Sequence, residues 1–491
     1  MEVGETMNKQ TLPNPLVKRA SLTPERTAFV FNGRSYSFQE IYNLSYNMAG
    51  HFQKQGVTNG DFVAILLRNH IDTVMIMLAL QLLGGVAVVL NNRLTAEELS
   101  WQINDSKPKL LVTEETFRNK SMELSIHIPT VWKETFDLST NYEANIQEEV
   151  NMESICTIMY TSGTTGHPKG VLQTYGNHWW SATGSALNLG LREEDCWLCS
   201  VPLFHISGYS ILMKSLVYGM KVVLHESFQP ERTIKDINEE KVTIMSVVAT
   251  MLSRVVDTLG NEKLHQGFRC MLLGGGPAPL PLLEKCVEKE VPVFQTYGLT
   301  ETSSQIVTLS PEYSINKLGS AGKPLFPSQL KIVDVDGYEA GPFESGEIIV
   351  KGPNVTSNYL NRDKADSFIH DWLKTGDVGY KDDEGFLYVQ DRRSDLIISG
   401  GENIYPAEIE GILTSHPDVI DAGVVGVDDE QWGQVPVAFV LVNRDINERE
   451  IIEFCSKKLA KYKLPKKVCF VDNIPRNASR KLLRRELRKM L

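Results

Sequence analysis

The sequence predicts an α/β protein with a large N-terminal domain and a small α+β C-terminal domain joined by a hinge. Short apolar segments alternate with segments of helix length over most of the chain, which is typical of stacked, mainly parallel sheets flanked by helices. After about Lys331, short strands with Gly-containing turns predominate, which indicates a small β-barrel-like region. The chain has 491 residues, and since a domain usually holds roughly 100 to 200 residues, two or more domains are expected.

The alternation of strands and helices begins at residue 62. Ile71–Leu83 has the length of a helix, and it overlaps the most apolar part of the chain, Val74–Leu90. Gln81 and two glycines interrupt that run, so a buried helix followed by a short strand is favoured over a membrane span, which needs about 20 apolar residues. The strands are expected at Phe62–Leu67, Val86–Leu90, Leu110–Thr113, Lys221–Leu224, Thr243–Val247, Cys270–Leu273 and Val291–Gln295.

The last part of the chain is predicted to be a separate unit. We place the boundary at Asp391, giving domains 1–390 and 391–491. Because no Pro/Ser-rich spacer follows, Asp391 is expected to act as a hinge rather than as the start of a flexible linker. Strands are expected at Leu330–Val333, Glu347–Lys351 and Phe386–Val389 before the boundary, and at Ala422–Val427 and Val437–Val442 after it, followed by a helix at Glu448–Tyr462 and a basic tail.

Bulk properties narrow the classes of function. The net charge of -11 disfavours general binding to nucleic-acid backbones, although a local positive site for ATP is compatible with it. Most of the seven cysteines lie in apolar stretches, which indicates reduced thiols in a cytoplasmic protein. Cys196 and Cys199 form a CxxC pair without a second ligand pair, so strand residues are favoured over a zinc site. The N-terminus lacks the apolar core of a signal peptide.

The strongest local signal is Tyr160–Gly170, with the sequence YTSGTTGHPKG. Apolar residues precede it, so it is expected to leave the end of a strand. Its glycines let backbone N–H groups turn towards an anion, and its hydroxyls and lysine add donors and a positive charge. The spacing differs from the Walker A motif, and a plain polar turn is the alternative. The candidate ATP-binding residues are Thr161, Ser162, Gly163, Thr164, Thr165, Gly166 and Lys169.

Five motifs, in the same order, resemble the acyl-adenylate-forming superfamily of acyl- and aryl-CoA ligases, luciferases and peptide-synthetase adenylation domains. After the loop come Tyr297–Thr302 (YGLTET), Thr375–Asp377 (TGD), Asp391–Asp395 (DRRSD) and Lys481. Each motif is weak alone, but together they cover nearly the whole chain. The resemblance implies that ATP activates a carboxylic acid as an acyl-AMP, and that the acyl group then moves to the thiol of coenzyme A.

The resemblance and the side-chain chemistry together imply roles around the nucleotide. Tyr297 is expected to stack on adenine, and Asp377 suits the ribose hydroxyls as an acceptor-only carboxylate. Glu301 is a hard oxygen ligand for the Mg²⁺ that bridges ATP phosphates, and Thr300 is expected to contact the α-phosphate. The residues alone leave two alternatives open, which are a core tyrosine at Tyr297 and a simple turn at Thr375–Asp377.

Further positions complete the expected nucleotide site. Arg392 is expected to contact the ribose or a phosphate, although a surface arginine paired with an acid is the alternative. Gly274, Gly275 and Gly276 follow an apolar strand, where glycines allow a flat ligand to approach the backbone. The resemblance implies that they border the adenine and acyl pockets.

Lys481 is expected to act in catalysis. Adenylation brings a carboxylate to the α-phosphate, and a lysine that reaches both anions would stabilise the charge that develops. The alternative is a solvated basic tail, and Arg480 stands where the family usually has glycine. The resemblance implies that the C-terminal domain then rotates about Asp391, withdrawing Lys481. The segment Ser399–Pro406, with Gly400 and Gly401, would line the thiol channel, or it is simply a glycine-rich loop before a helix.

His205 bears on the acid substrate. In the family, amino-acid-activating domains have an aspartate at this position, so a histidine indicates a plain carboxylic acid, with a buried structural histidine as the alternative. The segments 272–286, 297–311 and 476–484 resemble the 2-succinylbenzoate:CoA ligases of menaquinone biosynthesis, whose substrate has two carboxylates. A buried second carboxylate needs a polar partner, for which Ser207, Thr250 and Lys214 are candidates by position.

Other classes remain as alternatives. Another aryl- or fatty-acyl-CoA ligase, or a non-catalytic AMP-binding protein, would carry many of the same motifs. The presence of both Glu301 and Lys481 favours an enzyme. The expected partners are therefore a small acid, ATP and coenzyme A, with no nucleic acid and no stable membrane insertion, and a homo-oligomer stays open.

Overall fold

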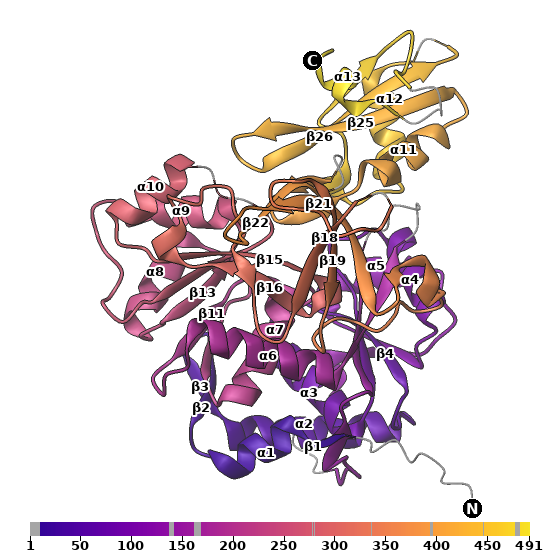
Figure 1. The fold of residues 1–491 in the computed structure, drawn as a ribbon. Coiled ribbons are helices and arrows are strands. Elements are labelled where there is room, and N and C mark those ends of the chain that lie inside the picture. The colour runs from indigo at the N-terminus through magenta and orange to yellow at the C-terminus, as the bar shows by residue number, and fades with distance from the viewer. Residues whose placement is uncertain are drawn as a thin grey trace, which may run out of the picture.

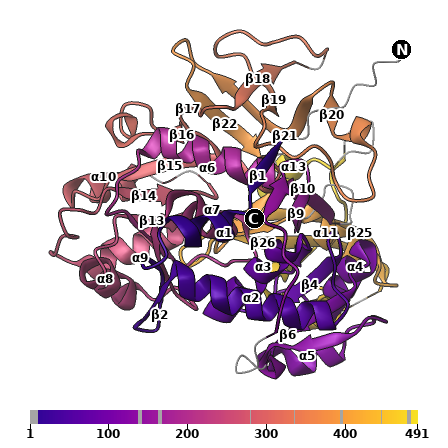
Figure 2. The same ribbon diagram turned by 90° about the horizontal axis from the view of Figure 1, so that it is seen from below.

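The N-terminal part of the chain builds two large sheets, and the C-terminal part builds a smaller one that lies over them (Figure 1, Figure 2). The computed structural model describes residues 10–136, 142–161, 168–276, 278, 280–334, 336–392, 396–444, 446–476 and 482–491. Near the start of the chain, β1 (Thr11–Pro13) pairs antiparallel with the distant strand β8 (Glu149–Asn151) in a two-stranded ribbon.

The first large sheet has six strands in the order β10-β9-β5-β4-β6-β7. Its strands are parallel except for β10, which runs antiparallel to β9. The bounds are β4 (Phe62–Leu66), β5 (Val86–Val89), β6 (Leu110–Thr113), β7 (Thr130–Trp132), β9 (Ile155–Thr161) and β10 (Lys169–Thr174), with α2 (Phe38–Lys54), α3 (Ile71–Leu83), α4 (Ala96–Ser106), α5 (Arg118–Met122), η1 (Glu115–Phe117) and η2 (Lys133–Thr135).

The second large sheet has nine strands in the order β17-β16-β15-β14-β13-β11-β12-β2-β3. The six strands from β15 to β2 are parallel, and antiparallel strands close both edges. The strands are β2 (Thr27–Phe31), β3 (Arg34–Ser37), β11 (Cys196–Cys199), β12 (Lys221–Leu224), β13 (Ile244–Val247), β14 (Cys270–Leu273), β15 (Val293–Leu299), β16 (Ser304–Leu309) and β17 (Lys323–Pro324).

Helices cover both faces of the second sheet. The largest cluster of buried apolar residues joins strands of both large sheets with α2, α3 and α7, and this explains why α3 is apolar on all sides. A second cluster packs α8 and α9 on the other face. The helices are α1 (Pro15–Leu22), α6 (Tyr175–Leu189), α7 (Ile206–Tyr218), α8 (Pro230–Glu239), α9 (Ala249–Leu259) and α10 (Leu280–Glu288), with η3 (Thr300–Thr302) and η4 (Pro311–Tyr313).

Two five-stranded sheets complete the chain. The antiparallel one contains β18 (Gln329–Val333), β19 (Gly346–Lys351), β20 (Phe368–Ile369), β21 (Trp372–Lys381) and β22 (Leu387–Arg392), with η5 (Lys364–Asp366). The C-terminal one contains β23 (Ile397–Ser399), β24 (Glu402–Ile404), β25 (Val419–Asp429), β26 (Gly433–Val442) and β27 (Lys467–Phe470), with α11 (Pro406–Thr414), α12 (Glu448–Ser456), η6 (Lys461–Lys463) and α13 (Arg484–Arg488). The predicted fold class is thereby confirmed. Asp391 lies in β22, and the next strand, β23, belongs to the C-terminal sheet.

Two predicted elements differ in extent from those observed. The predicted strand Val291–Gln295 is β15, which continues to Leu299 because antiparallel pairing with β16 extends it. The predicted helix Glu448–Tyr462 was too long, because α12 ends at Ser456. Ala460 and Tyr462 instead pack into an apolar cluster of the first large sheet, so burial against the N-terminal domain replaces the last turns of the helix.

A buried ion triad also joins the C-terminal sheet region to the N-terminal domain. The Lys463 Nζ lies 2.5 Å from Oε1 of Glu98 on α4 and 2.7 Å from Oε1 of Glu408 on α11. Lys463 is 4% exposed, so these charges are largely removed from water. Breaking one partner of such a buried group is costly, because a charge is left without compensation. The triad therefore favours the relative placement of the two parts seen in Figure 1.

The expectation of a buried helix in Val74–Leu90 is confirmed by α3, and Cys196 and Cys199 lie in the buried strand β11 as expected. Over the parts of the chain that the structure describes, no helix combines the length and the hydropathy that a membrane crossing would require.

We predict that Gly322→Ala lowers the free energy of unfolding by at least about 2 kcal/mol, since a left-handed backbone is strained for alanine and a clash adds to the strain. Gly322 has a φ of +101°, and a Cβ there would collide with the backbone carbonyl of Thr308. Thermal and urea unfolding measure the change. Gly411→Ala is the matched control, because a Cβ at that position of α11 meets nothing within 4 Å. It should instead stabilise by roughly 0.5–1 kcal/mol. Equal effects of both variants would contradict this account of Gly322.

Candidate active site

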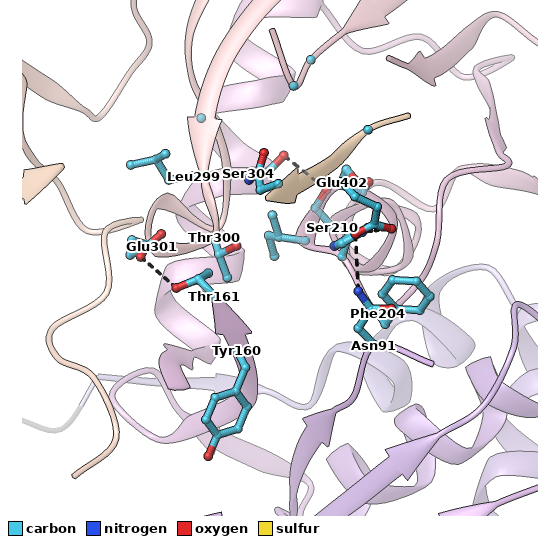
Figure 3. Close-up of a pocket in the computed structure, with 18 of the residues that line it drawn as sticks. Asn91, Tyr160, Thr161, Phe204, Ser210, Leu299, Thr300, Glu301, Ser304 and Glu402 are labelled. Carbon is cyan, nitrogen blue, oxygen red and sulfur yellow. Dashed lines mark hydrogen bonds and ion pairs between the residues drawn. The ribbon is translucent and has the colours of Figure 1, made fainter. Parts of the chain in front are cut away.

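A cavity of about 450 Å³ lies between the N-terminal domain and the C-terminal sheet region. Residues from both parts line it, so its shape depends on how the two parts are placed. Figure 3 shows that side chains from distant segments, including Asn91, Thr161 and Glu402, face this space. The sequence-predicted residues that line it are Thr161, Lys169, His205, Ser207, Lys214, Gly274, Gly275, Thr300, Glu301, Asp377 and Gly401.

The two ends of the glycine/threonine loop face each other. Thr161 ends β9 and Lys169 begins β10, and the two residues are direct partners in the antiparallel ladder. Ser162, Gly163, Thr164, Thr165 and Gly166 lie outside the described residues, so their predicted phosphate contacts stay predictions. The ammonium of Lys169 lies 5.1 Å from the centre of the Tyr359 ring. A positive charge and a hydroxyl thus stand side by side at the cavity wall.

Glu301 lies opposite this hairpin, on the short helix η3 between β15 and β16. The Tyr359 hydroxyl donates to its Oε1 over 2.9 Å, and the Thr161 hydroxyl lies 3.5 Å from the same oxygen. Figure 3 shows Thr161, Thr300 and Glu301 next to one another. Burial raises the pKa of the Glu301 carboxyl, and Asp377 adds to the rise while Lys169 opposes it. A bound cation would reverse that shift by stabilising the charged form.

The donor set around Glu301 fits Mg²⁺. The cavity presents a carboxylate and neighbouring hydroxyl oxygens from Thr161 and Tyr359, which are hard oxygen ligands. Mg²⁺ is commonly held by one or two carboxylates together with substrate phosphates and water, rather than by a complete protein cage. One carboxylate beside a predicted phosphate loop is therefore sufficient as the protein's share of the site.

Tyr297 of β15 and Asp377 of β21 belong to different sheets, and their side chains meet between them. The Tyr297 hydroxyl donates to Oδ2 of Asp377 over 2.7 Å. Asp377 lines the cavity, whereas Tyr297 is only 5% exposed behind it. The motif Thr375–Asp377 lies within β21, with Gly376 at a φ of +72°, so it is part of a strand rather than a free turn. The Asp377 carboxylate is held in place by a buried hydroxyl, as a group that binds ribose hydroxyls would need to be.

The predicted glycine segments take up different places. Gly274 and Gly275 line the cavity, while a Cβ at Gly276 would approach Ile398 of the C-terminal sheet. Gly401 also lines the cavity, whereas Gly400 lies against the ring of Trp432. Gly400 and Gly401 both have a positive φ, which only glycine adopts readily.

The acyl end of the cavity is built by α7. His205 precedes the first turn, and Ser207, Ser210 and Lys214 follow at helical spacing, so they share one face of the helix. Lys214 is 1% exposed, and its ammonium lies 4.8 Å from the centre of the Trp197 ring. Among the residues that the structure describes, none forms a hydrogen bond or an ion pair with Lys214. Burial lowers its pKa to about 8.

Thr250, the other candidate for a second carboxylate, lies elsewhere. It is on α9 and is not part of the cavity lining. Its methyl group would contact a Cβ added at Gly433 of β26. Its position suits contact between the two parts of the chain rather than contact with a ligand in the cavity.

Glu402 connects the two parts at the cavity wall. Its Oε1 lies 2.5 Å from Nη1 of Arg93 and 3.2 Å from Nε2 of His205, and Asn91 Nδ2 lies 3.4 Å from its Oε2. Burial alone would raise the pKa of Glu402, but the charges of His205 and Arg93 outweigh it and lower the pKa to about 2. The carboxylate is therefore charged at neutral pH and bound to the N-terminal domain.

Some expected residues fall outside this description. Lys481 lies outside the described residues, and so do the side chains of Asp391 and Arg392, whose backbone belongs to β22. Sequence reasoning also missed several residues. Tyr359 belongs to no motif, and neither Arg93 nor Lys463 stood out among many charged residues. Glu402 was within the glycine-containing segment, where a single acid carries no local signal of burial.

We predict that Glu402→Gln speeds amide hydrogen exchange in β24 by roughly 10-fold, because a partly exposed ion pair contributes about 1 kcal/mol. The folded pKa of Glu402 is depressed. The pairing is therefore fully present above the ordinary carboxyl pKa and is lost as the pH falls towards 2. Exchange followed by mass spectrometry at neutral pH tests this. Glu453→Gln, at an exposed ion pair of α12, should leave β24 unchanged, and unchanged exchange in Glu402→Gln would refute the role of the contact.

Comparisons with known proteins agree with this geometry. The 2-succinylbenzoate–CoA ligase of a Bacillus cereus strain is 53% identical over 484 residues, covering 98% of this chain and 99% of the relative. A double mutant of the o-succinylbenzoate CoA synthetase of Bacillus subtilis, bound to a product analogue, has a TM-score of 0.93 at 49% identity, and 98% of each chain is covered.

Other structures of the Bacillus subtilis enzyme match less closely in shape. Its complex with the acyl-adenylate intermediate has a TM-score of 0.77 at 50% identity, covering 97% of this chain and 98% of that one. Its complex with ATP and a magnesium ion also has a TM-score of 0.77 at 50% identity, covering 98% and 100%. The model described as AMP-binding enzyme matches residues 16–360, and that described as AMP-binding enzyme C-terminal domain matches residues 408–481. The chain belongs to the AMP-binding enzyme family.

Proposed function

We propose that this protein is an AMP-forming acid:CoA ligase that uses ATP and Mg²⁺ to join 2-succinylbenzoate to coenzyme A, in menaquinone biosynthesis. The match to a 2-succinylbenzoate–CoA ligase, which is 53% identical over 98% of this chain, supports the reaction. The cavity supports it independently, because Thr161 and Lys169 at the ends of the glycine/threonine loop, the Glu301 carboxylate and the buried Lys214 all line it. The buried Lys214 is the single observation that carries the choice of acid.

In the first half-reaction the acid's carboxylate attacks the α-phosphorus of ATP, an acyl–phosphate bond forms, and pyrophosphate leaves. Lys169 and the donors of the glycine/threonine loop would hold the triphosphate. Glu301 would bind Mg²⁺, which offsets phosphate charge when bound. Asp377 would orient the ribose, with Thr300 at the α-phosphate and Lys481 as the cation that lets two anions meet. Thr161, Thr300, Glu301 and Asp377 all line one cavity, which supports their acting together.

Lys214 favours a substrate with a second negative charge. A buried ammonium is unfavourable without a hydrogen bond or a negative charge to compensate it, and beyond the ring of Trp197 no described residue supplies either. With a pKa of about 8, the ammonium is the main form at neutral pH. 2-Succinylbenzoate has two carboxylates, so one can be activated while the other pairs with Lys214. The chain of a fatty acid would instead place methylene groups against an ammonium, which disfavours a fatty-acyl-CoA ligase.

A non-catalytic AMP-binding protein is also disfavoured. Such a protein would have no need for a carboxylate at Glu301 aimed between Tyr359 and Thr161. It would equally have no need for the buried lysine at the acyl end.

In the second half-reaction the thiol of coenzyme A attacks the acyl carbonyl, a thioester forms, and AMP leaves. We propose that the present placement of the C-terminal domain, with a boundary and pivot at Asp391, serves this step. The TM-score of 0.93 with the product-analogue complex, against 0.77 with the ATP and acyl-adenylate complexes, supports it. So does the presence of Gly401, Glu402 and Asn403 in the cavity wall.

The described residues that flank residues 477–481 in the sequence are placed within the C-terminal sheet region. Arg476 and Leu482, on either side of this segment, form a β-bridge. Arg476 pairs with Asp421 of β25, and Leu482 lies close to Gly423. Figure 1 shows α13, which follows, at the end of the C-terminal domain that is remote from the N-terminal domain.

We also propose that the enzyme works in the cytoplasm. All seven cysteines are free and six are buried, which suits a reducing compartment.

ATP–pyrophosphate exchange over a panel of acids tests the proposed reaction. The wild-type protein should turn over 2-succinylbenzoate at least roughly 10²-fold better, in kcat/KM, than 4-oxo-4-phenylbutanoate or 2-propanoylbenzoate, which each lack one carboxylate. In Lys214→Met that preference should fall by roughly 10²-fold, since a charged hydrogen-bonded pair contributes about 2–3 kcal/mol. Lys235→Met, at an exposed pair of α8, is the control. A preference that survives in Lys214→Met would exclude Lys214 as the partner, and no exchange with any acid would exclude the ligase.

Lys481→Ala should lose roughly 10²-fold or more of the adenylation rate, because the cation between the carboxylate and the α-phosphate is removed. Thioester formation from presynthesised acyl-adenylate should be nearly intact, because the first barrier has already been passed. Single-turnover assays of the two steps measure this split. An equal loss in both steps would argue against a lysine that acts in one domain placement only.

A further inference from the structure

The segment from Thr300 to Ser303 is anchored through every one of its carbonyl groups. Three of the donors are side chains from other elements, and one is a backbone N–H. The bonds are Gln173 Nε2 to Thr300 O (2.8 Å), Thr356 N to Glu301 O (2.7 Å), Asn354 Nδ2 to Thr302 O (3.2 Å) and Ser181 Oγ to Ser303 O (2.6 Å). A turn that carries two predicted active-site residues is thus fixed from behind by β10, α6 and the loop before Tyr359.

Of the three side-chain donors, Gln173 is the one that bonds to a predicted site residue, Thr300. It lies on β10, four residues after Lys169, and its side chain is 0% exposed. Its amide can bond correctly in one orientation only. The Thr157 hydroxyl, on the partner residue of β9, donates to Gln173 Oε1 over 2.7 Å. An amide oxygen cannot donate, so the Nε2 must face the Thr300 carbonyl.

His178 on α6 extends this arrangement by one step. Its Nε2 lies 3.0 Å from the Thr157 hydroxyl oxygen. The single hydroxyl proton of Thr157 is already given to Gln173, so Nε2 must carry the hydrogen. Burial lowers the pKa of His178 to about 3, and the ring is therefore neutral with one N–H. The hydrogen bonds then run in one direction, from His178 to Thr157 to Gln173 to Thr300.

We infer that Gln173, held by Thr157 and His178, is a positioning residue for the adenylation step. It fixes the Thr300 backbone and so places the Thr300 hydroxyl and the Glu301 carboxylate at the phosphate end of the cavity. This inference rests on the proposed function, in which the Thr300 hydroxyl contacts the α-phosphate and the Glu301 carboxylate binds Mg²⁺ during the first half-reaction. A displacement of a catalytic group by about 1 Å can lower a rate by roughly 10²-fold, so an anchor behind the turn affects the rate without touching a substrate.

Two apolar replacements test this chain of hydrogen bonds, one at Gln173 and one at Thr157. Gln173→Met removes the donor to Thr300 while keeping a similar length. Thr157→Val keeps the shape of the side chain and removes only the hydroxyl that sets the amide, so it tests the proposal even if Gln173→Met folds poorly. Thr157→Ser restores the hydroxyl and is the conservative variant that should rescue activity.

Matched controls carry the same chemical changes at other buried sites. Thr233 on α8 is 0% exposed, and its hydroxyl has no partner among the described residues. Gln295 on β15 is 5% exposed, and its Nε2 also has none within the described chain. Neither residue lines the cavity. Thr233→Val and Gln295→Met therefore report the effect of losing a buried polar group as such.

Single-turnover adenylation of 2-succinylbenzoate, monitored by pyrophosphate release at saturating ATP, is the measurement. The rate should fall roughly 10- to 10²-fold in Gln173→Met and about 3- to 10-fold in Thr157→Val, with the KM for ATP changed less than about 3-fold. Thr157→Ser and both controls should stay within about 2-fold of wild type. Thioester formation from preformed acyl-adenylate should be affected much less than adenylation in Gln173→Met.

The outcomes separate this inference from the proposed function. A wild-type protein that forms no acyl-adenylate with any acid would overturn the function itself. If the wild type is active, any one of three results would overturn the positioning role. These are a near-normal adenylation rate in folded Gln173→Met or Thr157→Val, a loss in Thr157→Ser as large as in Thr157→Val, and equal losses in the control variants.

Discussion

The structure depends on buried charge between its two parts. Lys463 bonds to acids from both sides of the junction, and Glu402 bonds to Arg93 and His205 across it. Such pairs are favourable only when the partners are placed correctly, because a charge left alone in a buried site is strongly penalised. These pairs therefore stabilise one relative placement of the two domains over others. The cavity exists in its present form because that placement completes its wall.

The site combines this movable wall with a fixed one. The Thr300–Ser303 turn is tied to three other elements of the N-terminal domain, and α7 presents His205, Ser207 and Lys214 along one face. The groups proposed to hold the nucleotide and the acid thus belong to a rigid scaffold. The groups proposed to change between the two half-reactions, Lys481 and the segment around Glu402, belong to the proposed C-terminal domain. A single cavity can then serve two reactions, because only one wall needs to be exchanged.

The fold class and most strands could be predicted from local patterns, since β4, β6, β12 and β14 are short apolar runs between helices. The end of α12 could not, because burial of Ala460 and Tyr462 against another domain decides it. At the site, the motifs predicted Thr161, Glu301 and Asp377, which line the cavity. Tyr359 and Glu402 acquire their roles from contacts across more than 50 and nearly 200 residues respectively. Gln173 could likewise not be identified from the sequence, because its proposed role depends on the orientation of its side-chain amide, which the hydrogen bond from Thr157 fixes.

The central claim is that buried inter-domain charge holds the thioester-forming placement. The most direct measurement is the single-turnover rate of each half-reaction in Glu98→Gln, which removes one charge from Lys463 at a position outside the cavity lining. The account predicts a fall of roughly 10-fold in thioester formation from preformed acyl-adenylate, with adenylation unchanged or faster. Equal slowing of both steps, or no change in thioester formation, would contradict it.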